Sequence, residues 1–220
     1  MSDALAPRLL PAGDAAVLLE FDSAEQVEAA HRFLTRQPAE GVIELVPAAR
    51  TILVHYDPAT FAPERLADAL SAADSAADSD GPAQPGDSRL VTVPVTVPVV
   101  YDGPDLEELS ATTGLSVAEI IERHAAPAYV VAFCGFSPGF AYLTGLDPLL
   151  RLPRRATPRT RVPAGSVAIA DEFAGVYPAA GPGGWHLLGR TDAVLWDLER
   201  DPPALLAPGV LVRFAPVAAA

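Results

Sequence analysis

Three stretches of this sequence combine glycine with aromatic, arginine and serine side chains. They are residues 133–146, 158–169 and 175–191. Glycine allows the backbone to take positive φ angles and to come close to a ligand. Aromatic rings supply rigid apolar walls, while arginine and serine supply specific polar contacts. The stretches therefore predict loops that line one concave site. Tight barrel corners packed on aromatic rings are the alternative, because such turns are common in β folds.

The three stretches contain ten residues that are predicted to bind a small molecule. Ser166 is expected to bind rather than to attack, because no Gly-x-Ser-x-Gly elbow surrounds it. Arg190 could hold an anionic group of the ligand in a bidentate fork. The full set is Phe136, Pro138, Gly139, Tyr142, Arg159, Ser166, Tyr177, Gly184, Trp185 and Arg190.

His124 is a candidate catalytic residue with two interpretations. Its spacing from Val117, Ile120 and Ile121 places it on the apolar face of a predicted helix. Because histidine titrates near neutral pH, it could transfer protons at the edge of a cleft. The other interpretation is a buried histidine that is satisfied by a backbone carbonyl. Cys134 is expected to be a small core residue, and the scattered histidines predict no metal site.

All fifteen basic residues are arginine, against 28 acidic residues. Without lysine, the chain cannot form a Schiff base, carry biotin or build a P-loop. The net charge of −13 disfavours binding to nucleic acids and anionic membranes. Residues 1–88 carry fifteen acids and five arginines, a net charge of −10, whereas residues 89–220 carry thirteen acids and ten arginines, a net charge of −3. The second part is therefore better suited to bind a small anion.

Five arginines fall within eleven residues that contain no acid, at positions 151, 154, 155, 159 and 161. We expect Arg151 and Arg155 to belong to a solvated basic loop.

An acidic segment of small residues, 74–88, divides the chain. It has no aromatic or branched aliphatic side chain, which is typical of a flexible linker. The sequence therefore predicts a small α+β domain over residues 1–73 and a second domain over residues 89–220.

The first domain has the order strand, helix, strand, strand, helix. Ser23 and Gln26 have the spacing of a capping box before the first helix, and Pro63 suits the first turn of the second helix. This order predicts a ferredoxin-like α/β sandwich. The predicted strands are residues 17–21, 42–46 and 51–56.

The second domain begins with residues 90–101, which are rich in valine but contain two prolines. Prolines remove ladder donors, so this segment is predicted to be an edge strand. Two short helices follow, one capped by Asp105 and ended by Gly114, the other begun by a capping box at residues 116–119. From residue 129 onward, short strands broken by glycine and proline predict an all-β barrel.

Four motifs occur in a specific order along the second domain. They are Gly-Phe-x-Pro-Gly-Phe from Gly135, Val-Pro-Ala-Gly-Ser-Val from Val162, Pro-Gly-Gly-Trp from Pro182 and Gly-Arg-Thr from Gly189. The chain thereby resembles the family of the B-type subunit of 5-oxoprolinase, allophanate hydrolase subunit 1 and a sporulation kinase inhibitor. The resemblance covers most of residues 90–216 and, more loosely, the first domain. It implies a cyclophilin-like β-barrel behind a small α+β domain.

The resemblance also implies a function, that of the B-type subunit of an ATP-dependent 5-oxoprolinase that opens 5-oxo-L-proline to L-glutamate. It implies two partners, a C-type chain of cyclophilin-like fold and an A-type chain, with ATP bound by or shared with them. Arg159 lies inside the family motif and is therefore predicted to hold a carboxylate or phosphoryl oxygen. The chain alone is expected to be inactive, because it has no P-loop, lysine or recognisable nucleophile constellation.

Two other functions fit the same resemblance. One is a regulator that binds and inhibits a histidine kinase. The other is an amide-processing subunit of the allophanate hydrolase or urea carboxylase type, with biotin carried elsewhere. No apolar run reaches the ~20 residues that span a bilayer, and the first residues lack the pattern of a secretory signal. A cytoplasmic location is therefore expected.

Overall fold

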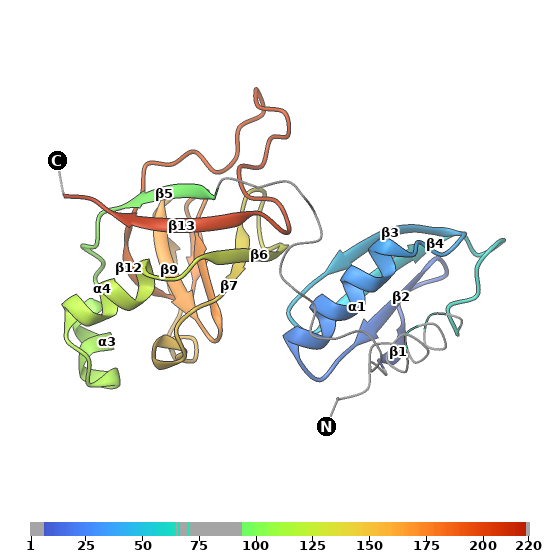
Figure 1. Ribbon diagram of the computed structural model, residues 1–220, viewed down its shortest axis with the longest axis horizontal. Helices are drawn as coiled ribbons and strands as arrows, with labels where there is room; N and C mark the ends of the chain where they lie inside the picture. Colours follow the sequence, from blue (N-terminus) through green and yellow to red (C-terminus); the bar gives the residue numbers. More distant parts are fainter. Residues whose placement is uncertain (1–6, 65, 67–69, 71–93, 219–220) are drawn as a thin grey trace. The chain divides into compact units, whose positions relative to one another are not determined.

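The structure is a computed structural model that describes residues 7–64, 66, 70 and 94–218. It divides into two compact units, Met1–Leu90 and Val91–Ala220, called here the N-terminal and C-terminal units. The predicted linker, residues 74–88, lies outside the described residues. A helix packs on a sheet in the N-terminal unit, while the C-terminal unit is a curled sheet with helices (Figure 1). The α+β class predicted from the sequence is confirmed.

The N-terminal unit contains a four-stranded antiparallel sheet in the order β1-β2-β4-β3. The sequence predicted three of these strands and missed β1, which pairs with β2 at the edge. Helix α1 (Ala24–Arg36) packs against β3 and β4. The strands are β1 (Arg8–Pro11), β2 (Ala16–Glu20), β3 (Val42–Pro47) and β4 (Thr51–Tyr56).

Helix α1 begins where the sequence predicted. The Ser23 hydroxyl accepts a hydrogen bond from the Gln26 amide at 3.3 Å. The Gln26 side chain accepts from the Asp22 amide rather than from the amide of Ser23, so only half of the predicted capping box forms. The apolar face of the helix, with Val27 and Leu34, is buried in the core of this unit.

The C-terminal unit contains a seven-stranded sheet in the order β12-β9-β10-β7-β6-β13-β5. The predicted proline-containing edge strand is β5, which pairs with β13 in parallel. The two sheet edges meet at Val100 and Arg190, which exchange two backbone hydrogen bonds of 2.9 Å. The strands are β5 (Val95–Val99), β6 (Tyr129–Cys134), β7 (Ala141–Thr144), β9 (Ser166–Ala170), β10 (Phe173–Val176), β12 (His186–Arg190) and β13 (Leu211–Pro216).

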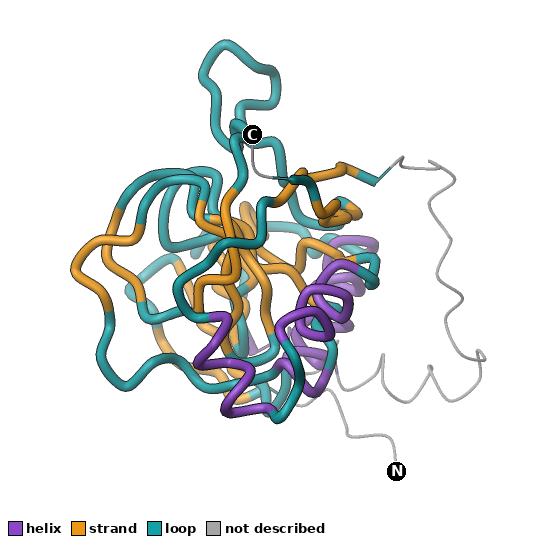
Figure 2. The backbone as a smooth tube through the Cα atoms, turned by 90° about the vertical axis from the view of Figure 1, so that its left-hand side faces the viewer, coloured by secondary structure: helices purple, strands orange, loops and turns teal. Residues whose placement is uncertain are grey.

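Gly189 makes this close approach possible. A Cβ atom at position 189 would lie 2.2 Å from the Val100 carbonyl oxygen, far inside van der Waals contact. The sheet is therefore nearly closed, and its strands curl around a common interior (Figure 2). The predicted barrel is confirmed.

Two helices, α3 (Leu106–Thr113) and α4 (Val117–Ala125), contribute apolar side chains to the barrel interior. The predicted ends are correct, because Gly114 adopts a left-handed φ of 74° and a complete capping box begins α4. The predicted cap of α3 is wrong. Asp105 precedes α3, but its carboxylate makes no capping hydrogen bond, since other partners occupy it.

Three short elements complete the C-terminal unit. A 3-10 turn, η1 (Pro148–Leu150), follows β7, and its Leu150 is buried in the barrel core. Strands β8 (Arg159–Val162) and β11 (Gly181–Gly183) form a separate two-stranded ribbon. This ribbon carries the predicted arginine motif.

Candidate functional site

The predicted aromatic residues form a layer outside the barrel core, and a β-bulge in β6 turns Phe133 to the same side. Val131 pairs with Leu143, and Phe133 pairs with Tyr142, so Ala132 is an extra residue in β6. Side chains alternate along a strand, and one extra residue reverses the alternation. Val131 and Leu143 belong to the interior core, whereas Phe133 and Tyr142 stack outside it with ring centroids 4.3 Å apart.

Phe140 is the centre of this aromatic layer. Its ring lies 5.1–5.4 Å from those of Phe136, Tyr142, Tyr177 and Trp185, at steep angles. Each such edge-to-face pair stabilises the fold by roughly 0.5–1.5 kcal/mol beyond its area burial. Phe140, Tyr177 and Trp185 are buried, while Phe136 and Tyr142 stay accessible. The layer therefore presents two rings to solvent on a rigid aromatic base. Phe140 was not among the predicted binding residues, although it lies in the same motif as Phe136.

Arg159 extends from the β8–β11 ribbon to the buried carboxylate of Asp105. Its Nη2 donates to Asp105 Oδ1 at 2.5 Å, and its Nη1 lies 3.4 Å from the Trp185 carbonyl oxygen. The side chain is only 25% exposed. Much of the predicted fork is therefore occupied within the chain, so Arg159 links the ribbon to the aromatic layer instead of standing free.

Asp105 is the main site residue that the sequence analysis missed. It is 2% exposed and also accepts hydrogen bonds from Arg155 Nη1 at 2.9 Å and from the Leu187 amide at 2.6 Å. Arg155 was expected in a solvated loop, but its side chain is 23% exposed and also contacts Glu108. This expectation was wrong because two carboxylates from the α3 region reach the arginine. Buried carboxylates need such partners, since an unpaired charge is costly in the interior.

Arg161 is the arginine of the ribbon that can receive an external anion. It lies two positions after Arg159 on β8, in the stretch where the pairing with β11 is irregular. Its side chain is exposed and has no ion-pair or hydrogen-bond partner within the described part of the chain. Arg154, in contrast, has a carboxylate partner, since its Nε lies 3.6 Å from Asp171 Oδ2. A carboxylate that approached this surface would meet Arg161 without first displacing an internal partner.

Tyr177 couples the arginines to the rings. Burial raises the pKa of its hydroxyl, while Arg154, a hydrogen bond from the Trp185 backbone and Arg159 oppose that rise. The hydroxyl therefore stays protonated and can act as a hydrogen-bonding group at the border between ring and guanidinium.

Ser166 and Arg190 are neighbours across β9 and β12, and their side chains have other partners. The Ser166 hydroxyl donates to the Pro163 carbonyl at 2.8 Å, and Arg190 Nε donates to Asp102 at 2.9 Å on the exposed surface. The Ser166 carbonyl accepts from the Tyr177 amide, which places it beside the layer. Both side chains are therefore already hydrogen-bonded within the chain, and neither is free to bind a ligand without breaking such a bond.

The three remaining predicted residues shape loops. Gly184 accepts a hydrogen bond through its carbonyl from the Arg155 amide at 2.7 Å. Pro138 is exposed at the tip of the turn that follows Phe136. Gly139 has a φ of 83°, and a Cβ atom there would lie 2.8 Å from Trp196 Cβ, so only glycine fits this turn against its neighbour.

His124 is wholly buried and stacks on Phe214 with ring centroids 4.6 Å apart. Its Nδ1 lies 2.7 Å from the Tyr101 hydroxyl, so its partner is a tyrosine and not the expected backbone carbonyl. Burial lowers its pKa to about 3. The neutral ring belongs to the core and is not at the edge of a cleft.

The described side chains of the site offer binding groups rather than a nucleophile. Burial raises the pKa of the Cys134 thiol, which keeps it protonated. Among residues 7–64, 66, 70 and 94–218, no cluster of three His, Cys, Asp or Glu side chains could hold a metal ion. In the same residues, no helix has both the length and the apolar character needed to cross a membrane.

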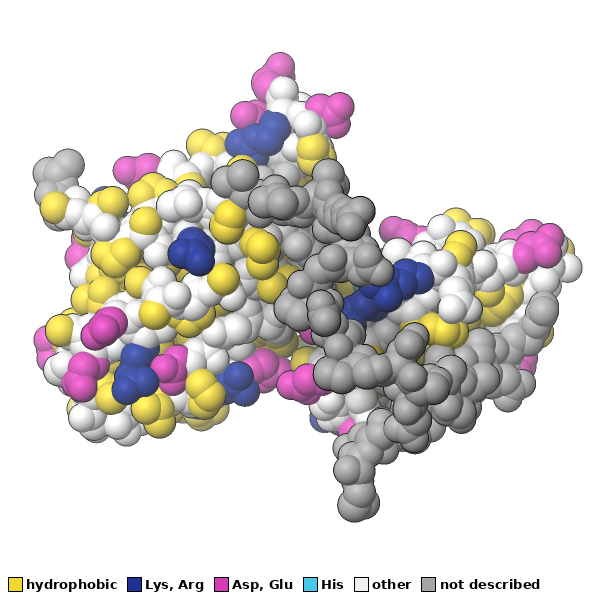
Figure 3. Space-filling view, in the orientation of Figure 1, with side chains coloured by type: hydrophobic (Ala, Val, Ile, Leu, Met, Phe, Trp, Pro, Cys, Tyr) yellow, Lys and Arg dark blue, Asp and Glu magenta, His cyan; other side chains and the backbone are white. Residues whose placement is uncertain are grey.

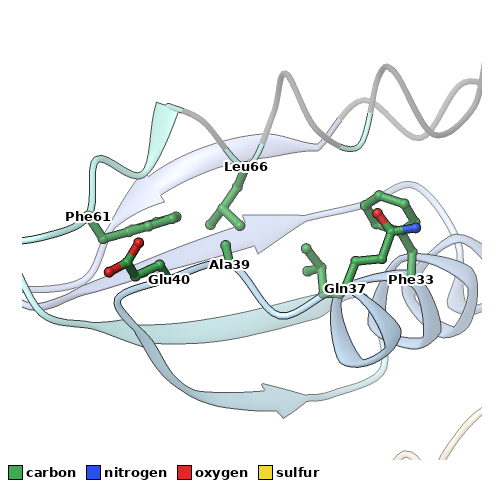
Figure 4. Close-up of a pocket in the computed structure, with 7 residues that line it drawn as sticks. Phe33, Gln37, Ala39, Glu40, Phe61 and Leu66 are labelled. Carbon is green, nitrogen blue, oxygen red and sulfur yellow. The ribbon is translucent and has the colours of Figure 1, made fainter.

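A cavity of about 220 Å³ lies in the N-terminal unit, between the end of α1 and the segment that carries Phe61 and Leu66. Leu66 points toward Ala39, and the Phe61 ring extends beside the Glu40 carboxylate (Figure 4). None of the ten predicted binding residues lines it. The cavity is therefore not part of the site formed by the aromatic layer and the ribbon.

Relatives with known names cover much of the chain. The B-type subunit of 5-oxoprolinase from Bacillus subtilis (strain 168) is 36% identical over 220 residues, which are 92% of this chain and 89% of that protein. Its namesake from Escherichia coli O157:H7 is 52% identical over 125 residues, which are 56% of this chain and 57% of that protein. The second match thus spans little more than half of the relative's length.

Solved structures share the fold. The protein TTHA0988 superposes with a TM-score of 0.71 at 35% identity, over 94% of this chain but only 40% of its own. A conserved uncharacterized protein of Pyrococcus horikoshii, PH0987, superposes with a TM-score of 0.56 at 35% identity, over 96% and 98% of the two chains. The urea amidolyase of Kluyveromyces lactis, at 22% identity and a TM-score of 0.70, shares the fold alone.

A family model described as "carboxyltransferase domain, subdomain C and D" matches residues 7–206. This match spans both units and every predicted binding residue. The resemblance predicted from the four motifs is confirmed, and the chain belongs to the family of carboxyltransferase domains, subdomains C and D.

Proposed function

We propose that the chain is the B-type subunit of an ATP-dependent 5-oxoprolinase, which opens 5-oxo-L-proline to L-glutamate. The observation that carries this proposal is the match to the Bacillus subtilis relative of that name over most of both chains. The Escherichia coli and Haemophilus influenzae relatives of the same name add support.

The chemistry of the substrate suits the exposed groups of the site. 5-Oxoproline is a compact lactam ring with one carboxylate. The accessible faces of Phe136 and Tyr142 can cover the ring, and Arg161 can bind the carboxylate through a bidentate pair. In this proposal Arg159 has a positioning role, because Asp105 and the Trp185 carbonyl hold it.

Ring opening needs activation from outside this chain. The lactam amide is stabilised by resonance, and phosphorylation of its oxygen by ATP would make the carbonyl carbon a better electrophile. Phosphoryl transfer depends on groups that position the phosphates and neutralise their charge. The chain has no lysine and no P-loop, so we propose that the C-type and A-type partner chains bind ATP and complete the site.

The test is reconstitution. The chain is purified alone, with a C-type chain, and with both C-type and A-type chains, and each mixture is assayed for ADP release that depends on 5-oxoproline. We expect turnover only in the full mixture. Full turnover by the isolated chain would contradict the shared site. Inactivity of every mixture, combined with binding to a histidine kinase, would support the alternative of a kinase regulator. Activity on a urea-derived amide would support the alternative of an amide-processing subunit of the allophanate hydrolase or urea carboxylase type.

A further inference from the structure

Half of the large, exposed apolar side chains in the described residues gather at one place in the C-terminal unit. Eight such side chains occur in those residues, and four of them are Phe136 (59% exposed), Val194 (57%), Trp196 (38%) and Leu198 (80%). We call these four residues the apolar patch. Single exposed apolar residues are ordinary, whereas a cluster marks an interaction surface.

The two segments that form the patch are in direct contact. Phe136 lies in the turn that ends at Gly139, and Gly139 packs against Leu195 and Trp196. The remaining residues belong to the long loop between β12 and β13, whose tip rises from the barrel (Figures 1 and 2), while its arms bury Leu195 and Leu206 in the barrel core. Residues separated by about sixty positions in the sequence thus present one surface.

The loop is held in place before any partner arrives. Trp196 and Ala204 form a β-bridge, and the Leu205 amide donates to the Leu195 carbonyl at 2.9 Å. The Arg200 guanidinium donates to the Val194 carbonyl at 3.0 Å. These bonds tie the two arms of the loop together, so docking would cost little ordering of the backbone.

The backbone conformation of Phe136 keeps its side chain exposed to solvent. Its φ is 68°, in the left-handed region that aromatic residues rarely adopt. Such strain persists where the surrounding structure imposes it, and it concentrates at functional positions. The strained turn keeps more than half of this large ring in solvent.

The rim of the patch is acidic. Asp192, Asp197, Glu199 and Asp201 lie on or beside the loop, and the Arg200 side chain is turned back onto the carbonyls of Val194 and Pro203. Acidic side chains gather on the loop that rises at the top of Figure 3. A partner that fits this surface would have an apolar groove bordered by arginine or lysine.

We propose that the apolar patch is the docking site of the C-type barrel, an inference that rests on the function proposed above. The similar region of TTHA0988 is only 40% of that chain, so in that relative the larger part of the same polypeptide is available to cover such a surface. The acidic rim and the apolar centre of the patch lead us to expect that the C-type barrel presents an apolar groove bordered by basic side chains.

Two leucines of the C-terminal unit give a matched test. Leu198→Asp places a charge in the patch, and Leu149→Asp places one at another exposed leucine, on η1. Both side chains point mainly into solvent, so both variants should fold, which circular dichroism and thermal melting would check. Binding to the purified C-type chain is measured by isothermal titration calorimetry. We expect Leu198→Asp to weaken binding tenfold or more, as substitution of a central contact does, and Leu149→Asp to change it less than twofold.

A charge variant tests the rim. Glu199→Arg should slow association with the C-type chain and reduce its dependence on salt, because rim charges act mainly on the rate of encounter. If the wild-type mixture binds and turns over 5-oxoproline while Leu198→Asp binds equally well, the patch proposal is wrong and the proposed function stands. If the wild-type chain does not bind the C-type chain, both are wrong. Self-association that Leu198→Asp abolishes would assign the patch to a second copy instead.

Discussion

The two faces of the barrel sheet differ in chemistry although the same strands build them. The inner face is mainly aliphatic, with Val131, Leu143, Val167 and Ile169 fully or almost fully buried. The outer face over β6, β7 and β10 is aromatic, and it presents two accessible rings, Phe136 and Tyr142. Aliphatic side chains fill space without direction, whereas rings and guanidinium groups recognise planar and charged partners. We therefore propose that the inner face carries the fold and the outer face carries recognition.

The largest expected effect removes the buried carboxylate that holds Arg155 and Arg159 beside the outer face. Asp105→Ala would leave Arg155 and Arg159 without their buried partner, and removing one partner of a buried ion pair costs about 3–5 kcal/mol. Asp102→Ala, which breaks the exposed pair with Arg190, is the matched control and should cost about 1 kcal/mol or less. Urea unfolding measures both. Equal costs for the two variants would show that the buried pairs of Asp105 contribute no more than an exposed pair.

The next largest effect compares the loss of unfolding free energy at two adjacent positions, one on each face of the sheet. Leu143 is fully buried in the core, so Leu143→Ala should lower the free energy of unfolding by about 2–5 kcal/mol through lost burial and a cavity. Tyr142, one residue earlier, faces outward and is partly exposed, so Tyr142→Ala should cost less. Denaturant titration of both variants tests this order. A larger loss for Tyr142→Ala would contradict the division between the faces.

The smallest effect concerns His124 in the interior. Its folded pKa of about 3 lies below the ordinary value near 6.5, so between these values the unfolded chain binds more protons. The unfolding free energy should therefore fall as the pH drops below about 6.5, by up to about 1.4 kcal/mol per pH unit. Between pH 7 and pH 5, wild type should lose about 2 kcal/mol more than His124→Gln.

Tyr101→Phe is the control for this pH effect. It removes the hydroxyl that bonds to His124 but leaves the ring buried, and burial is the cause of the shift. The variant should be less stable than wild type at neutral pH and keep the wild-type slope. Identical slopes for wild type and His124→Gln would show that His124 is not the titrating group.

Much of the fold could be predicted because its signals are local. The strand at residues 51–56, the buried positions of α1, the capping box of α4 and Gly114 all depend on neighbours within one or two turns. The proline-bearing edge strand also followed from a local rule, the missing amide donors.

The candidate site could be predicted only in part. The motifs identified the rings that form the layer, but the bulge at Ala132 decides which face Phe133 occupies, and alternation along the strand cannot reveal an extra residue. Asp105 looked like a helix cap because its true partners, Arg155, Arg159 and Leu187, are 50 to 82 positions away. Because of the same sequence separation, the pairing of Arg159 with Asp105, which leaves Arg159 unavailable to a ligand, could not be predicted. Arg161, in contrast, has no partner among the described residues.

The most direct test of the central claim compares two rings of the outer layer in the reconstituted enzyme. Tyr142 is accessible, whereas Phe173 contacts it from the buried side of the layer. Tyr142→Leu should lower kcat/KM for 5-oxoproline about tenfold or more, which corresponds to roughly 1.4 kcal/mol of lost transition-state stabilisation. Phe173→Leu should lower stability while largely preserving kcat/KM. An unchanged kcat/KM in Tyr142→Leu, or an equal loss in both variants, would contradict the claim that the outer face carries recognition.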